Sequence, residues 1–199
     1  MDEHKNEYPF FAMLSRMKYI NRWGLMRNNR NENIQEHSLQ VAVIAHALAL
    51  MRNKYFGGCV DADRVAVVAI FHDCDEILTG DLPTPVKYFN ENILSAYRGV
   101  GEAAKERLLS MLPDELRPDY CKFLYDDGDD STIHKLVKAA DTICAYIKCL
   151  EEIAGGNTEF SAAAKLTRSK LDAIELPEVH KFILDYIGAF SLSLDEYGI

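Results

Sequence analysis

Apolar residues recur every three or four positions through most of the chain, and no stretch alternates convincingly between apolar and polar positions. In the segment 34–54, Val41, Ile44, Ala45 and Leu48 fall on one row of a helix. Glycine and proline residues mark the breaks between the periodic segments. The pattern predicts helices over residues 9–19, 34–54, 61–78, 90–111, 114–125, 131–154, 157–174 and 177–194. An all-α fold, a helical bundle, is therefore expected.

The composition is that of a globular protein, with 48% hydrophobic and 27% charged residues. A chain of 199 residues suits one domain, and no linker long enough to divide it is visible. Residues 1–199 are therefore expected to form a single domain. The formal net charge of −9 argues against a nucleic-acid polymer or an anionic membrane as the partner.

Cysteine usage and the start of the chain bear on location. The five cysteines form no Cys-x-x-Cys pair, which is typical of reduced thiols rather than of a disulfide framework. The N-terminal residues are too polar for a signal peptide. No apolar run approaches the roughly 18 residues that span a bilayer. We therefore expect a soluble protein of the cytoplasm.

Two segments concentrate charge. Residues 9–30 contain no acidic residue but five basic ones: Arg16, Lys18, Arg22, Arg27 and Arg30. Such a segment can bind a small anion or form a solvated or partner-facing helix surface, and the charge pattern alone leaves both interpretations open. The acidic run at 126–130 lacks EF-hand spacing and is expected to be a solvated turn.

The dipeptide His72-Asp73 is the first candidate for chemistry. It follows the apolar run 65–71, where burying a charged aspartate is costly unless a partner or a metal compensates it. If the predicted helix continues, Glu76 lies on the same surface, four residues after His72 and three after Asp73. These residues favour a metal site with a spare carboxylate. A buried His–Asp hydrogen bond beside a helix end is the alternative, and the dipeptide alone leaves it open.

Two more polar side chains are predicted to point inward. His37 lies in the first turn of the helix over 34–54, on its buried row, and Asp141 lies on the apolar face of the helix over 131–154. A lone inward histidine is more often a satisfied core residue than a ligand. Three helices that each direct imidazole or carboxylate inward instead indicate a site for one divalent metal, such as Mn²⁺, Co²⁺, Fe²⁺, Mg²⁺ or Zn²⁺.

The order His37, His72-Asp73, Asp141 resembles the H…HD…D signature of the HD-domain metal phosphohydrolases. The surrounding segments are similar to those of the bacterial HD-domain 5′-deoxynucleotidases of the YfbR type, and they cover residues 21–23, 32–42, 71–89 and 138–152. Four matching segments in the right order are far more specific than the dipeptide. This chain departs from the pattern at Cys74-Asp75, where small residues are commoner, and matches only loosely near its C-terminus.

The resemblance implies a role for each matching residue. One divalent metal would be held by the set His37, His72, Asp73 and Asp141, with the substrate phosphate completing its shell, so that His37, Asp73 and Asp141 would also border the substrate. Glu76 would position and deprotonate the attacking water. Arg22 would orient the phosphate.

The resemblance also implies a nucleoside pocket. Trp23 would lie against the nucleoside, although a single tryptophan can equally serve core packing. A loop of Asp81, Leu82, Pro83 and Thr84 would face the sugar, with Asp81 taking the 3′-hydroxyl and the loop leaving little room for a 2′-hydroxyl.

The expected activity is hydrolysis of 2′-deoxynucleoside 5′-monophosphates to deoxynucleoside and phosphate. Within the superfamily the alternative is a nucleoside triphosphohydrolase or a phosphodiesterase on a small nucleotide. An alternative of another class is a non-catalytic HD domain that senses a nucleotide, for which Glu76 would have no obvious use. The family likeness further suggests a homodimer.

Overall fold

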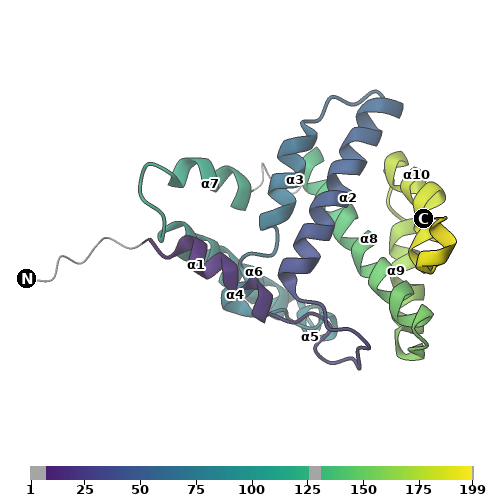
Figure 1. Ribbon diagram of the computed structural model, residues 1–199. Helices are drawn as coiled ribbons and strands as arrows, with labels where there is room; N and C mark the ends of the chain where they lie inside the picture. Colours follow the sequence, from purple (N-terminus) through teal and green to yellow (C-terminus); the bar gives the residue numbers. More distant parts are fainter. Residues whose placement is uncertain (1–7, 126–130, 199) are drawn as a thin grey trace, which may run out of the picture.

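The computed structural model describes residues 8–125 and 131–198, and the regular structure in these ranges is helical (Figure 1). In chain order the elements are α1 Phe10–Leu14, η1 Ser15–Tyr19, α2 Ile34–Tyr55, α3 Ala62–Phe71, α4 Glu76–Thr79, α5 Thr84–Lys87, α6 Glu91–Leu109, α7 Arg117–Leu124, α8 Thr132–Ala154, η2 Thr158–Phe160, α9 Ser161–Asp172, α10 Pro177–Tyr186, η3 Ile187–Ser191 and η4 Leu194–Tyr197. The predicted all-α class is confirmed. The acidic run at 126–130 lies outside the described residues.

The main core forms where α2 packs against α3 and α8. α2 begins at Ile34 because the Asn33 side chain accepts backbone N–H groups of the first helical turn. The predicted row is buried, with Val41, Ala45 and Leu48 fully enclosed. A side chain such as valine or leucine contributes roughly 1.5–3 kcal/mol when it is buried in this way. This packing fixes the direction in which the first turn of α2 points.

Two further groups of helices flank the centre (Figure 1). α9 and α10 lie on one side, with Leu171, Val179 and Ile183 buried in the main core. α1, α6 and α7 lie on the other side, where Phe10 and Leu108 belong to a second buried cluster. The short helices α4 and α5 pack on α6. The middle of the molecule is thus the meeting place of α2, α8 and the end of α3.

The helix predicted over 61–78 is interrupted: it stops after α3 and resumes as α4. Nδ1 of His72 lies 2.7 Å from the carbonyl oxygen of Ala69, to which it donates a hydrogen bond. A continuing α-helix would need that carbonyl for the N–H of Asp73. The histidine side chain therefore competes with the backbone at the point where the helix ends, and the prediction of one unbroken helix was wrong.

Other helix ends also differ from prediction, and two of them have a clear local cause. α7 begins at Arg117 instead of Asp114, because Pro118 lacks the N–H that would bond to the Asp114 carbonyl. The last predicted helix is α-helical only to Tyr186 and continues as the 3₁₀ turn η3. A glycine within η3 weakens the α-helix at that point.

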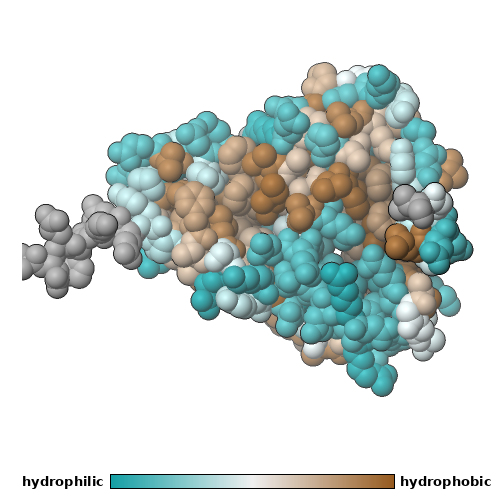
Figure 2. Space-filling view, in the orientation of Figure 1, coloured by the Kyte–Doolittle hydropathy of each residue, from teal (hydrophilic) through white to brown (hydrophobic). Residues whose placement is uncertain are grey.

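The surface is mixed in character. Figure 2 shows hydrophobic residues in a band across the middle of one face, with hydrophilic residues covering much of the lower part. Within the described residues, no helix combines the length and the apolar character needed to cross a membrane.

Candidate active site

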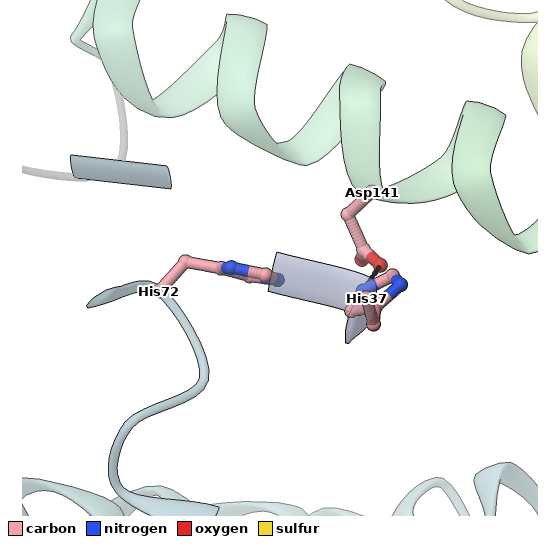
Figure 3. A group of neighbouring side chains, drawn as sticks. All are labelled: His37, His72 and Asp141. Atoms are coloured by element: carbon pink, nitrogen blue, oxygen red, sulfur yellow. Dashed lines mark hydrogen bonds and ion pairs between the residues drawn. The ribbon is translucent and has the colours of Figure 1, made fainter. Parts of the chain in front are cut away.

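Three side chains from distant parts of the chain meet between the central helices (Figure 3). His37 comes from the first turn of α2, His72 from the end of α3, and Asp141 from the middle of α8. One ligand atom from each lies within 4.8 Å of the others, so the three can contact a single ion. Nε2 of His37 is 3.0 Å from Oδ1 of Asp141. His37 is fully buried, whereas the side chain of Asp141 is 39% exposed, so the cluster opens toward solvent on the α8 side.

Asp73 completes the cluster. Its Oδ2 lies 3.1 Å from Nε2 of His72 and 3.8 Å from Nε2 of His37. All four predicted metal ligands are therefore neighbours, although the helix break places Asp73 on a turn and not on α3.

The donor atoms fit a divalent metal. Because Nδ1 of His72 must donate to the Ala69 carbonyl, the neutral ring carries no proton on Nε2. This Nε2 is buried and, although it lies 3.1 Å from Oδ2 of Asp73, forms no hydrogen bond among the described residues. In the neutral ring, Nε2 is therefore a buried, unprotonated nitrogen next to two carboxylates, an arrangement that a metal ion would satisfy. Two imidazoles and two carboxylates suit Zn²⁺, Mn²⁺, Fe²⁺ or Co²⁺.

The electrostatics also favour a cation. Burial would raise the pKa of Asp73, but the adjacent His72, His37 and Arg22 hold it well below its usual range. Burial would lower the pKa of His72, but Asp73 and Asp141 raise it to about 9. Without a metal, His72 thus tends to supply the positive charge that the carboxylates require, and a divalent ion would supply it instead.

Glu76 is the first residue of α4 and is buried. Burial, together with the carboxylates of Asp73 and Asp81, raises its pKa to about 10, against the opposing charges of Arg22 and Lys87. Its Oε2 has no hydrogen-bond partner in the described structure. Without a metal this raised pKa keeps the carboxyl group protonated near neutral pH, and ionised beside a bound cation it would have the properties of a proton acceptor.

Arg22 is the one member of the basic segment that reaches the cluster. Its Nη1 lies 3.3 Å from Oδ2 of Asp73, its Nη2 lies 3.8 Å from Oδ1 of Asp141, and its side chain is only 13% exposed. Arg27, by contrast, is 92% exposed and pairs with Glu159. Arg22 therefore lies at the cluster, where binding of a small anion stays a prediction, whereas Arg27 belongs to the solvated surface.

Trp23 makes the packing contact considered for it, and its contact with a nucleoside stays a prediction. Its ring packs against Phe160 with the centroids 5.4 Å apart, and its Nε1–H donates to Glu32 across 3.1 Å. Its backbone has a φ of 59°, in the left-handed region that a bulky residue rarely adopts. The surrounding contacts must hold this strained conformation.

The predicted sugar loop joins α4 to α5. Burial and Asp73 raise the pKa of Asp81, while Arg22 lowers it, which places Asp81 within the field of the cluster. Leu82 and Pro83 are half-buried, and Thr84 is the exposed first residue of α5. Behind the loop, the Tyr97 hydroxyl donates to the carbonyl of Gly80 across 3.2 Å. Lys87 lies over the Tyr97 ring, 5.0 Å from its centroid.

Glu32 was not identified from the sequence as a site residue. It contacts Arg22 and Trp23, and Oε1 lies 3.9 Å from Nδ1 of His37. The available signal was its place as the first acidic residue after the basic segment, five positions before His37.

Solved structures of other proteins share this fold. A solved HD-domain phosphohydrolase of Listeria innocua superposes with a TM-score of 0.81 at 22% identity, covering 96% of this chain and 92% of its own. The cyanophage S-2L HD phosphohydrolase DatZ, solved with dA and one catalytic Zn²⁺ ion, superposes with a TM-score of 0.61 at 17% identity, covering 90% of this chain and 95% of its own. The fold is that of the HD-domain phosphohydrolases.

Relatives of higher sequence identity show the family to which the chain belongs. A profile described as 5′-deoxynucleotidase YfbR-like matches residues 9–190. The 5′-deoxynucleotidase VV1113 of Vibrio vulnificus is 51% identical over 190 residues, covering 96% of this chain and 98% of its own. The 5′-deoxynucleotidase YfbR of Escherichia coli is 50% identical over 187 residues, covering 94% of each chain. The chain belongs to the YfbR-like 5′-deoxynucleotidase family.

Proposed function

We propose that the protein is a metal-dependent phosphomonoesterase that hydrolyses 2′-deoxynucleoside 5′-monophosphates to deoxynucleoside and phosphate. The observation that carries the proposal is the meeting of His37, His72, Asp73 and Asp141 on three separate elements, beside a buried basic carboxylate and a buried arginine. The activity named for relatives at about half identity agrees with this chemistry.

These four side chains would hold one divalent metal. When bound, the ion supplies Lewis-acid stabilisation of charge on the phosphoryl oxygens. The partnerless Nε2 of His72 supports its assignment as a ligand. Cys74 follows Asp73 in the sequence but is buried in the second cluster with Phe10, apart from the four proposed ligands.

Glu76 would accept a proton from the attacking water, because a divalent cation in the cluster would lower its raised pKa and leave the carboxylate ionised. The oxygen of that water forms the new bond to phosphorus as the bond to the 5′-oxygen breaks. The proton held on Glu76 is then available to the leaving 5′-oxygen. Arg22 would orient the phosphate through its Nη groups, which already face the carboxylates of the cluster.

Trp23 and the loop 81–84 would bind the nucleoside, with Asp81 receiving the 3′-hydroxyl. The place of Asp81 in the electrostatic field of Arg22 and Asp73 supports this role. DatZ, which shares this fold, was solved bound to dA, and this agrees with a deoxynucleoside as the ligand proposed here.

Three broader proposals accompany this function. The five free cysteines support a location in the cytoplasm. The exposed Leu39, Val43 and Leu50 on α2 provide an apolar surface for a homodimer. The main core draws helices from both halves of the chain, which supports one domain over residues 1–199.

The test is phosphate release from ribo- and deoxyribonucleoside monophosphates and triphosphates, with Mn²⁺, Co²⁺ or EDTA. Glu76→Gln is compared with Glu91→Gln, because Glu91 is also the first residue of its helix but is exposed. We expect metal-dependent release from deoxymonophosphates, lost by at least ~100-fold in Glu76→Gln and unchanged in Glu91→Gln. Release from triphosphates alone favours a triphosphohydrolase, and nucleotide binding without release favours a sensor; either result overturns the proposal.

A further inference from the structure

We propose that Glu32 is a positioning residue that aligns Arg22, Trp23 and the metal-binding ring of His37. This inference rests on the proposed metal site, but it concerns a residue to which that proposal gives no task. Glu32 is itself placed by the backbone: the N–H of Arg22 donates to the carbonyl of Glu32 across 2.9 Å. The N–H of Ile34 donates to the carbonyl of Ile20 across 3.0 Å, so the two segments pair antiparallel and close the intervening loop at its base.

One carboxylate oxygen of Glu32 holds two site residues. Oε2 lies 3.3 Å from Nε of Arg22 and accepts the Nε1–H of Trp23 across 3.1 Å. Because Nε of Arg22 is engaged here, the two Nη groups at the other end of the guanidinium face Asp73 and Asp141. The side chain of Glu32 is only 13% exposed, so water weakens these contacts less than it would at the surface.

The bond to Trp23 acts on a strained residue. The backbone of Trp23, with its φ of 59°, is in an unfavourable conformation. The contacts that hold it there include the hydrogen bond from the indole nitrogen to Glu32 and the packing of the ring on Phe160. Loss of the Glu32 carboxylate would therefore allow Trp23 to leave its present orientation. The proposed contact with the nucleoside requires that orientation.

The other carboxylate oxygen faces His37. Nε2 of this buried ring points into the cluster, toward Asp141, and Nδ1 points away from it, 3.9 Å from Oε1 of Glu32. Nδ1 is buried and has no hydrogen-bond partner among the described residues. A histidine that binds a metal through one nitrogen carries its proton on the other, and a carboxylate facing that N–H fixes the tautomer and the ring orientation. Glu32 is the carboxylate in that position.

The variants Glu32→Gln, which removes the charge, and Glu32→Ala, which removes the acceptor as well, test the inference. Glu159→Gln is the matched control, because Glu159 also pairs with an arginine of this loop, Arg27, yet forms no hydrogen bond or ion pair with Arg22, Trp23 or His37. Calorimetric titration of the metal-free protein with Co²⁺ is expected to show a loss of ~10–100-fold in affinity for both Glu32 variants and no change for Glu159→Gln.

A second readout needs neither metal nor substrate. Trp23 is the only tryptophan in the chain, so intrinsic fluorescence reports on this position alone. Glu32→Ala is expected to increase quenching by acrylamide, with Glu159→Gln unchanged. Wild-type Co²⁺ affinity together with wild-type quenching in the Glu32 variants overturns the inference.

The tautomer of His37 gives a test without any variant. In the Zn²⁺-loaded wild-type protein, long-range ¹H–¹⁵N spectra are expected to show the proton on Nδ1 of His37; a proton on Nε2 overturns the inference even if the variants fail to fold. None of these readouts involves a nucleotide. Failure of the proposed activity, seen as absent phosphate release by the wild-type protein, is therefore distinguishable from failure of this alignment.

Discussion

The loop that carries the predicted substrate residues rests on a buried carboxylate, Glu152 of α8, which is 2% exposed. Its oxygens accept the backbone N–H groups of Asn29 and Arg30 across 2.8 and 3.2 Å and the side-chain amide of Asn157 across 2.8 Å. Lys148 donates to the same carboxylate and to the Arg30 carbonyl. Replacing Glu152 by glutamine removes the charge that these donors share, so we expect a less stable protein.

The size of the expected loss of stability follows from the pKa of Glu152. Burial would raise the pKa of Glu152, but the hydrogen bonds from Lys148, Asn29, Asn157 and Arg30 lower it from 4.5 to about 2. A difference of this size corresponds to ~3 kcal/mol of stability at neutral pH. Because the overlying loop is exposed and solvent screens part of the charge, we reduce this to about 2 kcal/mol. Because the pKa is lower in the folded state, the contribution is complete above about pH 5 and is lost as the pH falls through 4.5 toward 2.

The assay is urea unfolding at pH 7 and at pH 3, with Glu151→Gln as control, since Glu151 is the exposed neighbour on the same helix. Glu152→Gln is expected to lose about 2 kcal/mol at pH 7 relative to the wild type, and the deficit should shrink at pH 3. The control should stay within ~0.5 kcal/mol at pH 7. An unchanged free energy of unfolding at pH 7, or a deficit that persists undiminished at pH 3, would refute the reasoning.

Three further predictions concern the core, the sugar loop and the metal. Leu48→Ala, at a fully buried position of α2, should lower the free energy of unfolding by ~2–5 kcal/mol in urea titrations; a loss under 1 kcal/mol would contradict the packing described. Gly80→Ala places a Cβ where φ is 73° and ψ is 161°, so it should cost ~1–3 kcal/mol and raise KM for deoxymonophosphates; unchanged unfolding would show that the loop relaxes freely. Removal of metal with EDTA should lower Tm, and Co²⁺ at ~100 times its Kd should restore about 2.7 kcal/mol; His37→Ala should abolish the restoration.

Sequence periodicity was sufficient for most of the architecture. α2 and α8 begin where Asn33 and Ser131 precede the buried helical rows, because both capping and amphipathic periodicity are local properties of the chain. The same periodicity placed His37 on the buried row of α2. Candidate ligands could therefore be identified from the direction in which each helix must turn its apolar face.

The distances between those ligands depend on the packing of α2, α3 and α8, which no local pattern specifies. The end of α3 is an example: the side chain of His72 takes the Ala69 carbonyl, and the sequence around it reads as a continuous helix. Glu32 is a second example, since Arg22, Trp23 and His37 become its neighbours only when the loop between Ile20 and Ile34 closes.

What the sequence by itself determined was thus the helical class, the residues that face inward and, through family resemblance, the chemistry. Only the tertiary structure decided which carboxylate lies beside which donor, as with Glu152 beneath the loop and Glu32 behind His37. The physical reason is that burial follows from short-range periodicity, whereas pairing of polar groups across α2, the loop and α8 depends on long-range packing geometry.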